Sequence, residues 1–131
     1  MSPESRIPKL RELTARLPAF PEEVAKEVGF KEHQMERGHS FSWNLMSRPE
    51  ISVARWFNSS GTAFPVHSHA EREWIIVFKG SLFLKLEDQD EVRLLSGMYA
   101  CINPGVEHSL RFEEDCFYLA VTIPRAKAWP E

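Results

Sequence analysis

Short runs of aromatic and β-branched residues alternate with turn residues from about residue 30 to residue 123, and this pattern constrains the fold more than any other feature. Apolar positions there recur every second residue, as in β-strands, rather than at the three-to-four-residue spacing of helices. The pattern predicts an all-β sandwich or barrel. We expect strands at 40–45, 51–57, 66–71, 74–78, 82–86, 91–94, 98–102, 108–112 and 117–123.

The predicted strand 74–78 is apolar on both faces, since its sequence is Trp-Ile-Ile-Val-Phe. A sheet with one face in water would expose half of these side chains. We therefore expect a second layer to cover the outer face, formed by a second sheet with the N-terminal helices or by another copy of the chain. The second arrangement would make the protein a homodimer.

The N-terminal part follows a different pattern. Apolar residues recur at helical spacing over 7–17, and residues 21–28 begin with proline and two glutamates and precede Gly29, as in a short capped helix. We expect residues 1–40 to form a helical or extended segment that packs on the barrel or on a partner subunit, and residues 41–131 to form the barrel. The two helices lack the third helix and the basic charge of a DNA-binding helix-turn-helix.

Charge and composition exclude several classes of protein. The formal net charge of −3 argues against a broad basic surface for nucleic acid. The sequence has no run of about 18 apolar residues that could cross a membrane, and its start lacks the features of a secretory signal. We expect a cytoplasmic protein with no membrane partner, in which Cys101 and Cys116 are free thiols.

Two histidines, His67 and His69, stand one residue apart directly before an apolar run. In a regular strand, side chains two residues apart point the same way, so both would face the interior together with Glu71 and Glu73. Neutral imidazoles beside a carboxylate are costly to bury unless something pairs with them, and a divalent metal ion pairs with all of them. His108, which follows an Asn-Pro-Gly turn, would point inward in the same way.

The spacing of these residues resembles that of the two motifs of the cupin family, over about residues 51–123. The first element is similar to the first cupin motif at every fixed position: Gly61, five residues, His67-x-His69, three residues, Glu73, six residues and Gly80. The second element is similar to the second motif: Gly97, five residues, Asn103-Pro104-Gly105, two residues and His108. It departs from that motif at Asn103, which replaces a proline, and at Phe112, which stands where the motif has an asparagine.

The resemblance implies a small single-domain cupin of the cupin 2, conserved barrel family, with a jelly-roll barrel, also called a double-stranded β-helix. It further implies one divalent transition-metal ion per chain (Fe, Mn, Ni, Zn or Cu), held by His67, His69, Glu73 and His108. Four protein ligands leave two positions of an octahedral ion open for water, O₂ or a chelating substrate.

Two residues are candidates for a catalytic role beside the metal, Glu71 and Tyr99. Glu71 shares its strand face with the ligands, but the motif spacing selects Glu73 as the ligand. A bend near Ala70 would turn Glu71 toward solvent.

Several other inward-facing residues are candidates to line the pocket. They are Trp56, Phe64, Tyr99, Cys101, Phe112 and Tyr118. A one-residue slip in strand register exchanges inside and outside, and plain core packing is the alternative role of each aromatic. The remaining histidines are expected outside the site: His39 in a loop, and His33 in a loop or at a helix edge.

The family resemblance leaves two functions open. The first is a metal-dependent enzyme, oxygenase-like (for example a dioxygenase) or isomerase-like, that acts on a small organic molecule in the barrel. The second is a non-catalytic cupin that binds a metal and a small ligand, or senses that ligand, with its N-terminal helices in contact with a partner protein.

Overall fold

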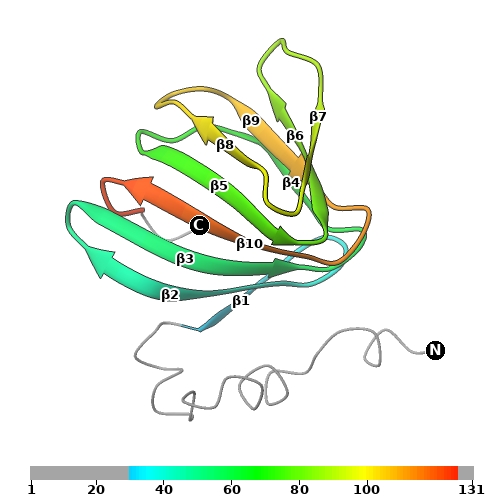
Figure 1. Cartoon of the computed structure of the whole chain (residues 1–131), viewed down its shortest axis with the longest axis horizontal. Helices are drawn as coiled ribbons and strands as arrows, with labels where there is room; N and C mark the ends of the chain where they lie inside the picture. The colour runs from blue at the N-terminus through cyan, green and yellow to red at the C-terminus, as the bar shows by residue number, and fades with distance from the viewer. Residues whose placement is uncertain (1–29, 127–131) are drawn as a thin grey trace.

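The computed structural model of the chain describes residues 30–126, and these residues form an all-β fold (Figure 1). The all-β prediction is therefore confirmed. The strands are β1 (Lys31–His33), β2 (Ser40–Arg48), β3 (Ile51–Asn58), β4 (Ala63–His67), β5 (Arg72–Lys79), β6 (Ser81–Leu86), β7 (Val92–Leu95), β8 (Tyr99–Ile102), β9 (His108–Arg111) and β10 (Cys116–Ile123).

The strands form two antiparallel sheets that curve around a common interior (Figure 1). The six-stranded sheet has the order β1-β2-β3-β10-β5-β8, and the four-stranded sheet has the order β4-β9-β6-β7. From β3 onward the chain passes back and forth between the two sheets, so most neighbours in a sheet are distant in sequence. This is the double-stranded β-helix that the motifs predicted.

The core lies between the two sheets, because each strand turns alternate side chains inward. Ile75, Val77 and Ile102 of the six-stranded sheet meet Leu82 and Leu84 of the four-stranded sheet, and all five are at most 1% exposed. Burying an aliphatic side chain of this size contributes about 1.5–3 kcal/mol relative to leaving it in water. The inward-facing apolar side chains of the strands thus hold the two sheets together.

Two differences from the predicted strands affect the site. The strand predicted at 66–71 is wrong over residues 68–71, because β4 ends at His67 and the chain then crosses from one sheet to the other. The alternating polar sequence of this crossing imitates a strand. The second difference is β1, which was not predicted and which adds to the edge of the six-stranded sheet by pairing with β2.

The turn at Gly80 shows why the first motif ends in glycine. Gly80 has a φ of 81°, in the left-handed region, and a Cβ there would collide with the backbone carbonyl of Asp115. Only glycine adopts this conformation without strain and leaves room for the neighbouring chain. The turn joins β5 of the six-stranded sheet to β6 of the four-stranded sheet.

The helices predicted at 7–17 and 21–28 lie outside the described residues. Within residues 30–126, no helix is long and apolar enough to cross a membrane. Both cysteines are free thiols, as predicted, with Cys101 exposed and Cys116 buried.

Candidate metal centre

Three histidines and a glutamate meet where the chain crosses between the sheets. His67 is the last residue of β4, and His69 lies in the crossing segment. Glu73 is the second residue of β5, and His108 begins β9 directly opposite His67. The four predicted ligands therefore come together, although His67, His69 and Glu73 do not share one regular strand as the sequence pattern indicated.

The three imidazole rings are closely packed. The ring centroids of His67 and His108 are 4.2 Å apart, and those of His69 and His108 are 5.0 Å apart. One ring nitrogen from each histidine lies within 4.8 Å of those of the other two, a spacing at which the three can hold one metal ion.

Glu73 adds a carboxylate to this cluster. Its Oε1 atom lies 3.1 Å from Nε2 of His69 and 3.7 Å from Nε2 of His108. Its side chain is 17% exposed, so the negative charge is largely removed from water. A shielded carboxylate beside imidazole nitrogens is a hard oxygen donor next to borderline nitrogen donors, which is a ligand set that divalent transition metals accept.

Hydrogen bonds to the backbone fix the orientation of all three rings. Each Nδ1 atom contacts the carbonyl oxygen of a residue two positions away: His67 to Pro65 at 2.7 Å, His69 to Glu71 at 2.9 Å and His108 to Val106 at 2.9 Å. A carbonyl oxygen only accepts, so each Nδ1 carries the proton and donates. In the neutral ring, Nε2 is then left with its lone pair, which is the tautomer that ligates a metal.

The surroundings of the Nε2 atom of His108 indicate whether a cation fits among the three rings. This atom is buried and has no hydrogen-bond partner among the described residues. A buried polar atom without a partner costs about 1–3 kcal/mol. A cation bound among the rings would satisfy this nitrogen, so the donor set fits a metal ion.

The protonation of the rings follows from their surroundings. Burial lowers the pKa of His67 and of His108 below the ordinary value of 6.5. The hydrogen bond with Glu73 instead raises the pKa of His69, because the carboxylate favours the imidazolium form. Without a metal, His69 is therefore the ring that holds a proton most readily, and it shares that proton with Glu73.

The turn before His108 is tied to the loop that carries His69. The backbone N–H of Gly105 donates to the carbonyl oxygen of His69 at 2.9 Å. Arg72 donates from Nη1 to Oδ1 of Asn103 at 2.7 Å, so the asparagine that departs from the motif has a structural role. The two motif segments are thus held against each other by one backbone hydrogen bond and one hydrogen bond between side chains.

A cavity of about 430 Å³ opens beside the cluster. His67, His69, Glu73 and His108 all line it. The strand register of the six-stranded sheet places small side chains next to each other on its inner face, at the cavity. Ala54 of β3 and Ala120 of β10 are direct partners, and their small side chains leave room where larger ones would fill the barrel.

One row of polar residues crosses the same inner face toward the cluster. Ser47, Ser52, Thr122 and Glu73 are successive cross-strand partners on β2, β3, β10 and β5. Ser52 and Thr122 share a hydrogen bond between their hydroxyl groups. The cavity therefore offers a ligand hydroxyl groups along one wall, in addition to the imidazoles and carboxylate.

Trp56, Phe64 and Tyr118 line the cavity, where the sequence analysis expected them. The Trp56 ring stacks on Tyr118 with centroids 6.1 Å apart and meets Phe64 edge to face at 5.8 Å. Tyr118 is fully enclosed, and its hydroxyl accepts a hydrogen bond from Nδ2 of Asn58 at 3.1 Å. These rings form the apolar wall of the cavity.

Tyr99, Cys101 and Phe112 are not at the cavity. Tyr99 is 69% exposed and Cys101 is also exposed. On β8 the inward positions belong to Ala100 and Ile102, so the expected register was off by one residue. Phe112 is buried in the core, where it stacks on Tyr118, and does not line the cavity.

Glu71 does not turn toward solvent as expected. The chain bends there, but the side chain is only 7% exposed and lines the cavity. Its Oε1 atom lies 3.6 Å from Nδ1 of His69. The bend, where the chain crosses from β4 to β5 of the other sheet, therefore directs Glu71 toward the cavity.

A fourth histidine, His33, lines the cavity and was missed. It lies on β1, is 6% exposed, and its Nε2 contacts the hydroxyl of Ser42 at 2.7 Å. Its ring stacks on Trp56 with centroids 4.6 Å apart. No motif includes this position, and only the unpredicted pairing of β1 with β2 brings it inside. His39, as expected, lies in a loop.

The comparisons with known proteins agree with this architecture. A family model described as "Cupin domain" matches residues 58–122. None of the curated proteins matches the sequence. Three solved structures have a similar fold. KdgF from Halomonas sp. is 18% identical, with 73% of this chain and 89% of that chain covered and a TM-score of 0.65, and a predicted oxalate decarboxylase from Thermotoga maritima is 21% identical, with 76% and 96% covered and a TM-score of 0.65. An RmlC-like cupin with a double-stranded β-helix fold from Methanocaldococcus jannaschii is 16% identical, with 73% and 89% covered and a TM-score of 0.61. At these identities the likeness shows the fold alone.

Proposed function

Since the chain belongs to the cupin family through a small cupin domain at residues 58–122, we propose that it binds one divalent transition-metal ion at His67, His69, Glu73 and His108. We further propose that it binds a small organic molecule in the adjoining cavity and acts on it as a metal-dependent enzyme. The observation that carries this proposal is the common orientation of the three rings. Each donates from Nδ1 to a carbonyl oxygen, which leaves its Nε2 atom available as a ligand.

The ligand set narrows the chemistry. Three imidazoles and one carboxylate suit Fe, Mn, Ni, Zn or Cu rather than Mg or Ca. When bound, such an ion supplies a Lewis acid that orients and polarises a carboxylate, enol or carbonyl oxygen of the substrate. His67, His69, Glu73 and His108 would hold four positions of an octahedral ion, which would leave two positions for that oxygen.

The chain's own residues contribute binding and proton transfer. The stacked rings of Trp56 and Tyr118 hold the apolar part of a ligand and exclude water, and the Ser52 and Thr122 hydroxyls accept or donate hydrogen bonds to its polar part. Glu71 is the candidate general base, since its carboxylate is buried at the cavity wall beside the proposed ligands. It would take a proton from a carbon or hydroxyl group of the bound molecule.

Both oxygenase-like and isomerase-like reactions use such a site. A buried carboxylate in the cavity favours the isomerase-like reaction, because removal of a proton next to a polarised carbonyl requires a base within reach. The alternative function, non-catalytic binding or sensing, is supported by the position of Tyr99. Of the two expected catalytic residues only Glu71 lines the cavity, which leaves few groups for acid–base chemistry.

Metal analysis tests the first part of the proposal. Protein purified without oxygen should carry about one transition-metal ion per chain, and the double variant His67→Ala/His108→Ala should carry almost none. His39→Ala is the matched control, because His39 lies in an exposed loop away from the cavity. Equal metal content in the wild type and the double variant would remove the site assignment.

Turnover separates the enzyme from the binding protein. Oxygen uptake by the Fe(II)-loaded protein with thiols, diketones and catechols tests the oxygenase-like reaction, and exchange of substrate hydrogens with D₂O tests the isomerase-like one. Glu71→Gln should abolish turnover while metal content stays unchanged. Tight binding of one compound without turnover or exchange would support the binding function instead.

A further inference from the structure

Two cationic residues, Lys31 and Arg125, line the cavity that adjoins the metal centre, and both are exposed. Neither belongs to residues 58–122, the part of the chain that the cupin model matches. Within residues 30–126, neither side chain forms an ion pair with a carboxylate. Cationic side chains at a cavity that have no carboxylate partner in the protein can bind an anionic group of a ligand.

The pairing of β1 with β2 places Lys31 at the cavity. Lys31 is the partner of Ser42 on β2, and Ser42 is the partner of Trp56 on β3. Both Ser42 and Trp56 line the cavity. His33, two residues further along β1, lines it as well, as expected of side chains that share one face of a strand. Lys31 therefore belongs to the wall that β1 adds to the barrel.

Arg125 reaches the cavity from the segment that follows β10. Its backbone N–H donates to the carbonyl oxygen of Pro49, in the turn between β2 and β3, at 3.2 Å. The N–H of Ala126 donates to the hydroxyl oxygen of Ser52 at 3.1 Å, and both of these residues line the cavity. The two bonds hold the segment against β2 and β3, so the backbone fixes the position of Arg125.

The other charged residues that line the cavity, histidines aside, are Glu71 and Glu73 at the metal centre. A divalent cation bound at the centre would balance these two carboxylates. The positive charges of Lys31 and Arg125 would then be in excess, so the metal-loaded cavity would attract an anion.

We propose that Lys31 and Arg125 bind a second carboxylate group of the molecule whose other end binds the metal ion. The inference rests on the proposed function and names its substrate class, a small acid with two anionic ends. The apolar middle of such an acid would lie against the rings of Trp56 and Tyr118. A guanidinium group can hold a carboxylate through two parallel hydrogen bonds, and a lysine adds a point charge.

Binding of matched acids to the Zn(II)-loaded full chain tests the proposal, since Zn(II) supports no redox chemistry. The probes are 2-oxoglutarate, 2-oxoadipate and 2-oxopimelate, which combine a chelating 2-oxo acid with a second carboxylate at increasing distance. Each is compared with the 2-oxo monoacid of the same chain length: 2-oxopentanoate, 2-oxohexanoate and 2-oxoheptanoate. In isothermal titration, at least one diacid should bind about tenfold more tightly than its monoacid.

Removal of the two charges should abolish this preference. In Lys31→Gln/Arg125→Gln, the affinity for the preferred diacid should fall about tenfold, and that for its monoacid should stay within a factor of about three. The zinc content should be unchanged, since neither residue is a proposed ligand of the metal.

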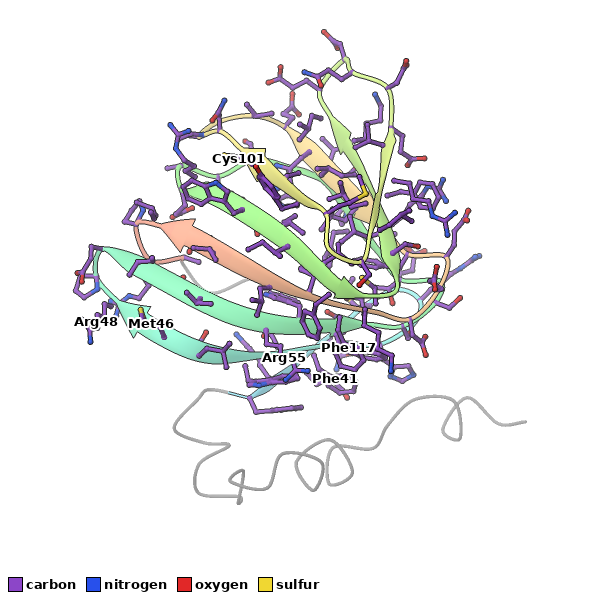
Figure 2. All side chains as sticks on the ribbon, viewed as in Figure 1. Phe41, Met46, Arg48, Arg55, Cys101 and Phe117 are labelled. Atoms are coloured by element: carbon purple, nitrogen blue, oxygen red, sulfur yellow. The ribbon has the colours of Figure 1, made fainter. Side chains whose placement is uncertain are left out.

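The matched control is Arg48→Gln/Lys79→Gln, which also removes two positive charges from exposed residues. Arg48 lies at the end of β2 and projects away from the barrel (Figure 2), and neither Arg48 nor Lys79 lines the cavity. This control should keep the preference of the wild type for the diacid. Its loss in the control as well would show that net charge, and not the cation pair, selects the ligand.

Two further results would overturn the proposal. One is equal affinity of the wild type for the diacid and the monoacid of every pair. The other is the absence of binding of any diacid up to about 10 mM. Failure of the metal centre gives a different result, in which the diacid is preferred equally with and without Zn(II). That result would remove the metal site and support the cation pair.

Discussion

His67 and His108 lie directly opposite each other in the antiparallel pair β4–β9, and their ring centroids are 4.2 Å apart. The two residues are 41 positions apart in the sequence, so the barrel topology alone brings them together. Both rings point into the cavity with Nδ1 bound to a nearby carbonyl oxygen. This pairing is the structural basis of the proposed metal centre.

Glu73 should contribute to metal affinity while its neighbour Glu71 should not. Glu73→Gln removes the charge that lies 3.1 Å from Nε2 of His69, so we expect metal affinity to fall by at least about tenfold. Glu71→Gln removes a carboxylate of the same size from the cavity wall and should leave affinity within a factor of about three. Competition with a chromogenic chelator measures both. Equal losses in the two variants would contradict the choice of Glu73 as ligand.

Metal affinity should increase with pH. In the metal-free protein, Glu73 raises the pKa of His69 above 6.5, so the proton on His69 stabilises the fold below pH 6.5. That contribution is lost as the pH rises through the raised pKa. A metal ion must displace this proton, so binding should strengthen as the pH rises toward the raised pKa of His69 and level off once His69 is neutral.

Isothermal titration in buffers of different ionisation enthalpy measures the protons released on binding. In Glu73→Gln the rise of affinity should move to lower pH, because the carboxylate no longer holds the proton on His69. The same pH profile in this variant and in the wild type would show that another group controls binding.

Gly105 should couple the turn to the metal site. Gly105 has a φ of 80°, so Gly105→Ala should lower the free energy of unfolding by about 1 kcal/mol or more. Gly105→Ala should also weaken metal binding, because the N–H of residue 105 donates a hydrogen bond to the carbonyl oxygen of His69, and strain in this turn would shift that bond. Gly97→Ala is the control. Gly97 also has a left-handed φ, of 90°, and an added Cβ would meet no neighbouring atom at either glycine, but the N–H of Gly97 donates to the carbonyl oxygen of Val77, away from the metal site. Denaturant unfolding and metal titration should show a stability loss in both variants and an affinity loss in Gly105→Ala alone.

Metal binding should stabilise the fold. At a free metal concentration of about 100 times the dissociation constant, a site that exists only in the folded state adds about 2.7 kcal/mol. The melting temperature should therefore rise when metal is added and fall again with excess chelator. His67→Ala/His108→Ala should not respond, whereas His39→Ala should respond like the wild type. A metal-dependent rise in the double variant would place the stabilising site elsewhere.

The sequence predicts the barrel and the residues of the cluster well, since both depend on local patterns. Short apolar runs bounded by turn residues locate β5 and β10, and the motif spacing selects His67, His69 and His108. The all-β class follows from the residues alone, whereas the jelly-roll barrel and the choice of ligands follow from the resemblance to the two cupin motifs.

The errors arise where side-chain direction depends on tertiary structure. Tyr99 and Cys101 were placed inside because β8 alone does not reveal its register against β5. Glu71 faces inward because the chain bends as it changes sheets. His33 enters the cavity only through the pairing of β1 with β2, and no local signal predicts a three-residue edge strand.

The most direct test of the central claim is X-ray absorption spectroscopy at the metal edge of the purified, metal-loaded protein, together with anomalous diffraction from its crystals. The account predicts a single ion at about 2.0–2.2 Å from one nitrogen each of His67, His69 and His108 and from one oxygen of Glu73. An ion bound elsewhere, or a first coordination shell without three imidazole nitrogens, would contradict it.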